Sequence, residues 1–133
     1  MQMTMTLKND FYELTATESS DSLPVYHIRL HPDNMIFKAH FPGEPVTPGV
    51  CLIQMGMELA EEYLQKKLRL RLLKNVKFLS VVSPLQTPTF SFRITKLTAD
   101  PENSQYSLQM AADAEGTPLL KMSMICTVLQ ALE

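Results

Sequence analysis

Three groups able to do chemistry occur within one short segment of the sequence. The segment reads His-Phe-Pro-Gly-Glu-Pro-Val-Thr-Pro-Gly-Val-Cys-Leu-Ile-Gln and covers residues 40–54. His40 carries an imidazole, and imidazoles titrate near neutral pH and can act as general bases. Gly49 follows Pro48 where a helix should begin, and the first amides of a helix have no intrahelical acceptor. Such amides, aided by the helix dipole, can bind a negatively charged oxygen.

The third group is the side-chain amide of Gln54, which lies in an otherwise apolar stretch. A buried amide without a partner costs on the order of a few kcal/mol, so its presence indicates a functional reason. An amide can form hydrogen bonds with a hydroxyl or with water, but it cannot deliver a proton at neutral pH. Glu58 lies one turn further along the same helix face and could substitute as the acid. We expect instead that Glu58 begins the solvated part of the helix.

Two strands and a turn are predicted before this segment. Residues 10–19 read as one strand, and residues 23–31 alternate between apolar and polar positions as a half-buried strand does. Residues 31–34 predict a turn, and Met35 to His40 read as a short extended piece. Four prolines and glycines then exclude regular structure up to residue 48: Pro42, Gly43, Pro45 and Pro48.

A helix should begin at Pro48, which suits the first helical position, and Thr47 can cap it. From Val50 to about Lys67 most residues favour a helix. Its first turns are apolar nearly all round, which indicates a helix that is buried on most sides.

The remaining sequence predicts four strands at residues 70–82, 88–98, 104–113 and 117–130, separated by turn signals. Strands, one long buried helix and then an antiparallel meander predict an α+β fold, with the sheet wrapped around a single central helix. Residues 1–133 should form one domain. Because such a sheet leaves an edge strand and apolar surface uncovered, we expect a homodimer or a larger homo-oligomer.

The segment at residues 40–54 resembles a pattern in the bacterial (3R)-hydroxyacyl-acyl-carrier-protein (ACP) dehydratases of fatty-acid synthesis. Seven positions agree in identity and spacing: His40, Phe41, Pro42, Gly43, Pro45, Pro48 and Gly49. The similarity continues at residues 74–78 and 81–84 and covers roughly residues 20–130. It implies the hotdog fold, which agrees with the sheet and helix inferred above.

The resemblance also implies roles for individual residues. His40 would be the catalytic base, and the amide of Gly49 would bind the thioester carbonyl, with Val50, Phe41 and Pro48 lining the substrate site. Gln54 stands where the family has Glu or Asp, a carboxyl group that reaches the substrate from the partner subunit. A second departure is Ala39, where the family usually has Gly.

Three functions are compatible with these residues. The first is a lyase that removes water from 3-hydroxyacyl-ACP to give the trans-2-enoyl thioester, in fatty-acid or polyene-type lipid synthesis. The second, motivated by Gln54, is a non-catalytic acyl-carrier binder or the silent subunit of a heteromeric dehydratase, paired with a paralogue. The third is a thioesterase, although the motif offers no obvious carboxylate to activate water. The motif favours an enzyme, but Gln54 leaves turnover open.

Composition and charge limit the classes of partner and cofactor that we expect. The net charge of −2 gives no reason to expect nucleic acid or membrane binding, and a cytoplasmic protein is the default. We expect no metal or cofactor, because the histidines, including His27 and His31, lack ligand spacing. Cys51 and Cys126 lie in apolar runs and should be buried thiols.

Basic residues cluster near the end of the helix, and no acidic residue interrupts them. The acyl carrier protein, which is acidic, could dock there, although a solvated helix end explains the charges equally well. The candidate contacts are Lys66, Lys67, Arg69, Arg71 and Lys74. A set of methionines could line an acyl tunnel or simply pack the core: Met55, Met57, Met110, Met122 and Met124.

Overall fold

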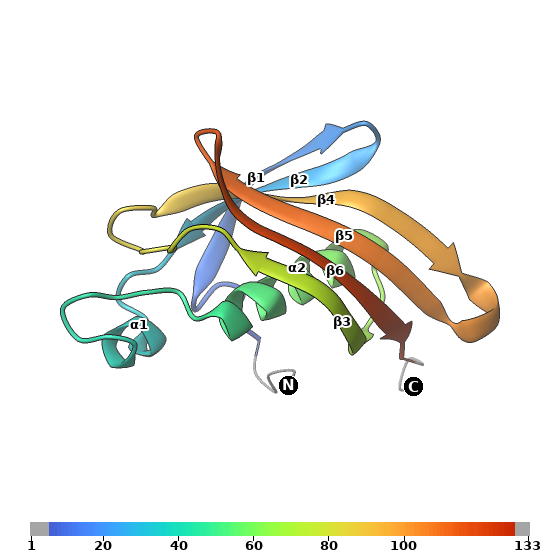
Figure 1. Cartoon of the computed structure of the whole chain (residues 1–133), viewed down its shortest axis with the longest axis horizontal. Helices are drawn as coiled ribbons and strands as arrows, with labels where there is room; N and C mark the ends of the chain where they lie inside the picture. The colour runs from blue at the N-terminus through green and yellow to red at the C-terminus, as the bar shows by residue number, and fades with distance from the viewer. Residues whose placement is uncertain (1–5, 130–133) are drawn as a thin grey trace.

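A six-stranded antiparallel sheet curves around one long helix in the computed structural model, which describes residues 6–129 (Figure 1). A short helix and a 3₁₀ turn complete the chain. In sequence order the elements are β1 (Tyr12–Ser20), β2 (Leu23–Leu30), α1 (Met35–Ala39), α2 (Gly49–Leu64), β3 (Leu68–Phe78), β4 (Thr89–Asp100), η1 (Pro101–Asn103), β5 (Gln105–Ala114) and β6 (Thr117–Val128). This confirms the α+β arrangement expected from the sequence.

The strand order explains why the helix lies against the sheet. The order is β1-β2-β4-β5-β6-β3, so the chain leaves β2 near one edge and returns at β3 on the other. Helix α2 makes this crossing, and it lies under the concave side of the sheet (Figure 1). Both β1 and β3 are edge strands, and β3 carries half-exposed apolar side chains, among them Leu72 and Phe78.

The strands separate apolar from polar side chains as the sequence predicts. In β2, Tyr26, Ile28 and Leu30 are buried, whereas Arg29 is exposed and His27 is half-buried. The other strands agree with their expected ranges to within a few residues, except that β3 ends at Phe78 rather than at residue 82. Residue 130, the expected end of the last strand, lies outside the described residues.

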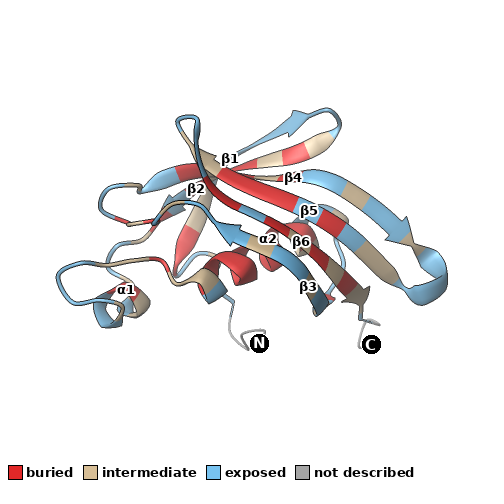
Figure 2. Ribbon diagram, in the orientation of Figure 1, coloured by how far each residue is buried: buried red, intermediate tan, exposed pale blue. Residues whose placement is uncertain are grey.

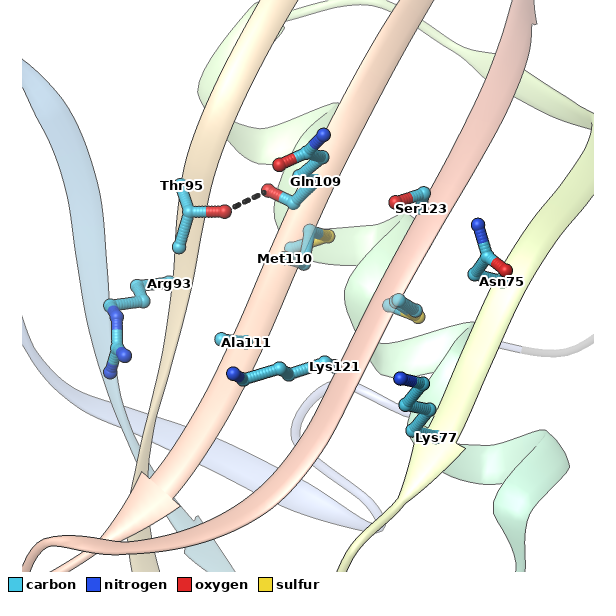
Figure 3. A pocket seen from close by; sticks show the side chains of 10 residues that line it. Asn75, Lys77, Arg93, Thr95, Gln109, Met110, Ala111, Lys121 and Ser123 are labelled. Atoms are coloured by element: carbon cyan, nitrogen blue, oxygen red, sulfur yellow. Dashed lines mark hydrogen bonds between the residues drawn. The ribbon is translucent and has the colours of Figure 1, made fainter.

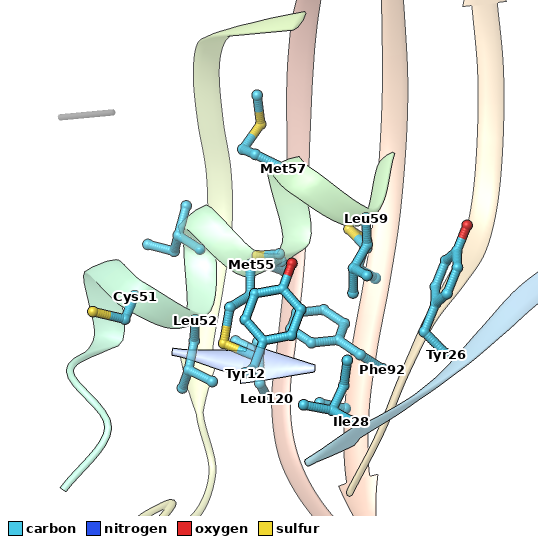
Figure 4. Close-up of a cluster of buried hydrophobic side chains, with 14 of the residues drawn as sticks. Tyr12, Tyr26, Ile28, Cys51, Leu52, Met55, Met57, Leu59, Phe92 and Leu120 are labelled. Carbon is cyan, nitrogen blue, oxygen red and sulfur yellow. The ribbon is translucent and has the colours of Figure 1, made fainter. Parts of the chain in front are cut away.

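Helix α2 is enclosed on all sides over much of its length, as its apolar first turns predict. Ten consecutive residues, Cys51–Ala60, are buried, more than packing on one sheet face alone would cover (Figure 2). Tyr12 and Phe92 are among the side chains packed around the helix (Figure 4). Buried Leu7 and Phe11 complete the N-terminal part of this core.

The methionines considered as a tunnel lining belong to this packed core. Each is at most 3% exposed, which places all five in the core and leaves none on an open channel of the single chain: Met55, Met57, Met110, Met122 and Met124.

Three details of the helix ends differ from the sequence prediction. Pro48 is the N-cap residue, with extended backbone angles, rather than the first helical residue. Thr47 makes no cap hydrogen bond, and its buried Oγ1 has no partner, so the expected cap is wrong. The helix ends at Leu64, before Lys67, because Gln65 adopts a left-handed conformation and donates its backbone N–H to Glu61.

The expectation of an extended piece from Met35 to His40 is also wrong. These residues form helix α1, which Asn34 caps by accepting the Ile36 amide at 2.9 Å. Phe37 is buried, and its ring stacks on Phe11 with the centroids 4.5 Å apart. The cap and this long-range ring contact stabilise the helix. The segment is too short for helical periodicity to show in the sequence.

Among the residues described, no helix is long and apolar enough to cross a membrane.

Gly56 is where α2 approaches the sheet most closely, which yields a stability prediction. A Cβ at this position would collide with the Met122 methyl group and press on Met110 and Phe92. We therefore expect Gly56→Ala to lower the free energy of unfolding by about 1–3 kcal/mol, although alanine favours helices. Urea unfolding followed by circular dichroism measures the change.

Gly49→Ala is the matched control, because the atoms nearest to its added Cβ all belong to the ring of Phe78. That ring is half exposed and can move into solvent. An equal or larger loss of stability in Gly49→Ala than in Gly56→Ala would contradict the packing argument.

Candidate active site

The loop from His40 to the start of α2 is fixed by backbone hydrogen bonds. The His40 N–H closes α1 by donating to Ile36 O at 3.0 Å, and His40 O accepts the Val46 amide at 2.9 Å. The Thr47 amide donates to Val82 O at 2.8 Å, which ties the loop to the β3–β4 connection. The chemical groups at the two ends of this loop therefore hold a defined relative position.

The imidazole of His40 is not a satisfied core side chain. His40 is half-buried, and its ring stacks on that of Phe41 with the centroids 4.1 Å apart. Its Nδ1 atom is buried and has no hydrogen-bond partner among the described residues. The peptide bond between the two residues is cis. The protein's own hydrogen bonds therefore leave one nitrogen of this half-buried imidazole unpaired.

The first amides of α2 are also available. Cys51 and Leu52 donate the first bonds of the helix, both to Pro48 O, at 3.0 and 3.2 Å. The amides of Gly49 and Val50 have no acceptor within residues 6–129. They lie at the positive end of a helix of 16 residues, where an oxygen carrying negative charge is stabilised.

Phe78 closes one side of this helix start. The tip of its ring lies 2.6 Å from the position that a Cβ on Gly49 would occupy. Because Gly49 has no side chain, the Phe78 ring can pack against the helix start, and the Gly49 amide stays accessible.

Gln54 and Glu58 form a hydrogen-bonded pair on the buried part of the helix. They are 7% and 8% exposed, so the expectation that Glu58 begins the solvated face is wrong. The Gln54 Nε2 donates to Glu58 Oε2 at 3.0 Å. The Gln54 Oε1 is buried and has no hydrogen-bond partner among residues 6–129.

Glu58 is buried because four donors surround its carboxylate. Oε2 accepts the Leu7 amide at 2.8 Å as well as the Gln54 amide, and Oε1 accepts the Lys8 amide and the Tyr12 hydroxyl, each at 2.9 Å. A buried charge needs such partners, and here three of the four come from the chain before β1 or from its first residue. The carboxylate thus holds the N-terminal segment onto α2.

Burial and the adjacent Glu58 carboxylate raise the pKa of Tyr12 well above its ordinary value. The phenol therefore remains protonated and continues to donate to Glu58 throughout the usable pH range. Sequence reasoning missed Tyr12, and it considered Glu58 only as a substitute acid before placing it at the start of the solvated face. A usable signal was that Leu59 and Ala60, which follow Glu58, are apolar and continue the buried run.

Of two cavities lined by charged residues, one adjoins the Gln54–Glu58 pair and the other does not. One, of about 340 Å³, is lined by Gln54, Glu58, Lys66 and Lys67, among others. The other, of about 550 Å³, lies on the outer face of the sheet, away from α2, with Lys77, Arg93 and Lys121 at its rim (Figure 3). It is remote from the motif and contains none of its residues.

The five basic residues considered for acyl-carrier contact are all exposed but do not gather around Gly49. Lys66 and Lys67 follow the far end of α2, roughly 24 Å along the axis from Gly49. Arg69, Arg71 and Lys74 follow on the edge strand β3.

The cysteines and the other histidines offer no nucleophile or base. Burial raises the pKa of the Cys51 thiol to about 11 and that of Cys126 to about 12, so both are protonated at neutral pH. His27 contacts Glu18 and Ser91 on the sheet surface, as expected of a structural residue. His31 Nε2 is buried and has no hydrogen-bond partner among residues 6–129, and His31 lies outside the motif.

The fold and the site define a hotdog-fold protein of the dehydratase type. The structure is similar to the dehydratase heterocomplex ApeI:P from Xenorhabdus doucetiae, with a TM-score of 0.60 and 19% identity over 86% of this chain and 96% of that one. It is also similar to the dehydratase domain of the CurJ module of the curacin polyketide synthase, with a TM-score of 0.55 and 14% identity over 90% of this chain and 43% of that one. Similarities at this level of identity show the fold.

Sequence comparison gives the family. A model of the ApeI-like dehydratases (ApeI dehydratase) matches residues 16–117, and the chain belongs to this family. The 3-hydroxyacyl-[acyl-carrier-protein] dehydratase FabZ of Clostridium acetobutylicum is 32% identical over 72 residues, which are 49% of this chain. The match spans about half of that relative, 51% of its length. The dehydratase family expected from the motif is thereby confirmed.

The Glu58 cluster gives a direct stability prediction. Replacing Glu58 by Ala leaves two backbone amides, a phenol and the Gln54 amide without their acceptor. We expect a loss of at least about 3 kcal/mol in the free energy of unfolding, measured by urea titration.

Glu62→Ala serves as the control on the same helix. It removes an exposed ion pair with Lys8 at 3.3 Å and should change stability by about 0.5 kcal/mol or less. Similar losses in the two variants would show that the buried carboxylate contributes no more than a surface charge.

Proposed function

We propose that this protein binds 3-hydroxyacyl thioesters carried on an acyl carrier protein and eliminates water to give the trans-2-enoyl thioester. The observation that carries this proposal is the pair of unpaired amides at Gly49 and Val50, joined by a fixed loop to an imidazole with an unpaired nitrogen. Membership of the ApeI-like dehydratase family supports it.

The chemistry follows from what each group can do. The thioester carbonyl accepts hydrogen bonds from the Gly49 and Val50 amides, which stabilise the negative oxygen that develops when the C2 proton leaves. His40 removes that proton as general base. Phe41 and Pro48 line the path of the acyl chain. The C3–O bond then breaks, and the hydroxyl takes up a proton to depart as water.

The departing hydroxyl needs a proton that Gln54 cannot supply. An amide can accept the hydroxyl hydrogen and hold the group in place, which leaves the oxygen lone pairs free. His40, protonated by the first step, then returns its proton to that oxygen. In this scheme Gln54 positions the hydroxyl and His40 moves the proton in both directions.

We further propose that the active unit is a homodimer in which Gln54 of one protomer reaches the His40 region of the other. The exposed apolar side chains on and just after β3, an outermost strand of the sheet, support pairing of two copies there. These side chains are Leu72, Phe78, Leu79 and Val81.

A second candidate function is that of a silent subunit, active only beside a paralogue that brings a carboxyl group. The unpaired amide oxygen of Gln54 favours it, because this chain offers no acid at that position. The ApeI:P structure is described as a heterocomplex, which shows that one dehydratase of this fold assembles from unlike chains. A thioesterase has less support, since both oxygens of Glu58 are engaged and could not activate water.

The lyase proposal is tested with purified protein and 3-hydroxyacyl-ACP or its enoyl counterpart, with absorbance of the conjugated thioester as the readout. His40→Ala should reduce turnover by about 10²–10⁴-fold, because it removes the group proposed to transfer both protons. Gln54→Glu should increase turnover, since a carboxyl beside Glu58 retains a proton through like-charge repulsion and can donate it.

Circular dichroism spectra of the variants confirm that they fold. Unchanged turnover in His40→Ala would refute the assigned base. An inactive wild type together with an active Gln54→Glu variant would exclude the lyase and favour the silent subunit.

The dimer is tested by light scattering after size-exclusion chromatography. A wild-type mass near twice the 15.1 kDa of one chain is expected. Val81→Lys, which places a charge among the exposed apolar side chains, should shift the mass toward that of a monomer. Lys96→Glu on β4, away from the edge, should leave the dimer intact; a monomeric wild type would contradict the proposal.

A further inference from the structure

The Glu58 carboxylate determines which end of the Gln54 amide faces away from it. An ionised carboxylate can only accept hydrogen bonds, so the amide must present its NH₂ group to Glu58. The distance of 3.0 Å between Gln54 Nε2 and Glu58 Oε2 agrees with this orientation. The carbonyl oxygen Oε1 consequently points the other way.

This orientation leaves Oε1 as an unsatisfied hydrogen-bond acceptor among residues 6–129. The atom is buried, in a side chain that is 7% exposed. An unpaired buried acceptor destabilises the folded protein. The reverse orientation would place two amide hydrogens there, but it would set one oxygen against another at Glu58. The cluster therefore creates a site for a hydrogen-bond donor and excludes one for an acceptor.

We infer that Glu58 is a positioning residue that makes Gln54 a hydrogen-bond acceptor, so that the site selects 3-hydroxyacyl chains over 3-oxoacyl chains. A 3-hydroxyl can donate to Oε1, whereas a 3-oxo group can only accept and would face a second acceptor. The inference rests on the proposed acyl-thioester function and adds to it the residue that orients Gln54 toward the hydroxyl at C3.

The Leu7 and Lys8 amides and the Tyr12 hydroxyl fix the Glu58 carboxylate, and the two amides alone engage both of its oxygens. Together the three donors occupy the other acceptor positions of Glu58, so the carboxylate cannot turn away from Gln54 without losing several bonds. The pair is also local, four residues apart on one helix, so its geometry does not depend on the dimer.

The experiment measures dissociation constants by titration calorimetry for two pantetheine conjugates, 3-hydroxyoctanoyl and 3-oxooctanoyl. An amide replaces the thioester in each, so that neither turns over. The wild type should bind the hydroxy conjugate about tenfold more tightly, the value of one hydrogen bond. Glu58→Gln should reduce this preference to about twofold or less, because a second amide lets Gln54 adopt either orientation.

Two control variants separate positioning from loosening of the structure. Glu62→Gln removes the same charge one turn along α2 without contacting Gln54, and it should keep the preference. Tyr12→Phe removes one donor to Glu58 and should lower stability, but it should also keep the preference, since the bond from Gln54 remains.

Each outcome bears on a different claim. If neither conjugate binds the wild type, the proposed acyl-thioester function fails and the inference falls with it. If both bind equally well to the wild type, or if Tyr12→Phe loses the preference as fully as Glu58→Gln, the positioning role is refuted while the proposed function stands.

Discussion

One buried carboxylate determines how the second side of the central helix is closed. The sheet covers α2 from its concave face, and a helix apolar nearly all round needs a cover on its other side as well. The chain before β1 provides part of that cover because Glu58 accepts the amides of Leu7 and Lys8 and the hydroxyl of Tyr12. The apolar side chains of Leu7 and Phe11 are then brought into the core. A polar interaction thus sets the position of the apolar packing around it.

The same interaction shows where sequence reasoning reached its limit. The sheet, the long helix and its burial could be predicted, because periodicity, turn residues and the apolar run at residues 50–57 are local signals. Glu58 could not be placed in the same way. Three of its four partners lie 46 to 51 residues away along the chain, and no local pattern reports that these donors will meet the carboxylate. Alone in the sequence, a glutamate at the end of an apolar run reads as the start of a solvated face.

The candidate site shows the same division between local and distant information. His40, Gly49 and Gln54 could be selected from the motif and its spacing. The structure adds that the imidazole nitrogen and the helix-start amides lack protein partners, which the motif alone does not reveal. The errors at Thr47 and in the segment Met35–His40 arise from the opposite cause. There, a plausible local signal was overruled by a tertiary contact or by the exact path of the loop.

The change from a carboxylate to an amide at position 54 has to be judged together with Glu58. An amide alone could turn either end toward a substrate and would specify little. Fixed by Glu58, it offers only an oxygen, so it can hold a hydroxyl but cannot protonate it. Elimination in such a site requires that the proton taken from C2 be the one returned to the leaving oxygen, which places both transfers on His40. Alternatively, the proton comes from an acid on a different chain. The orientation of one amide therefore reduces the mechanism to these two routes, and the activity of the isolated protein distinguishes between them.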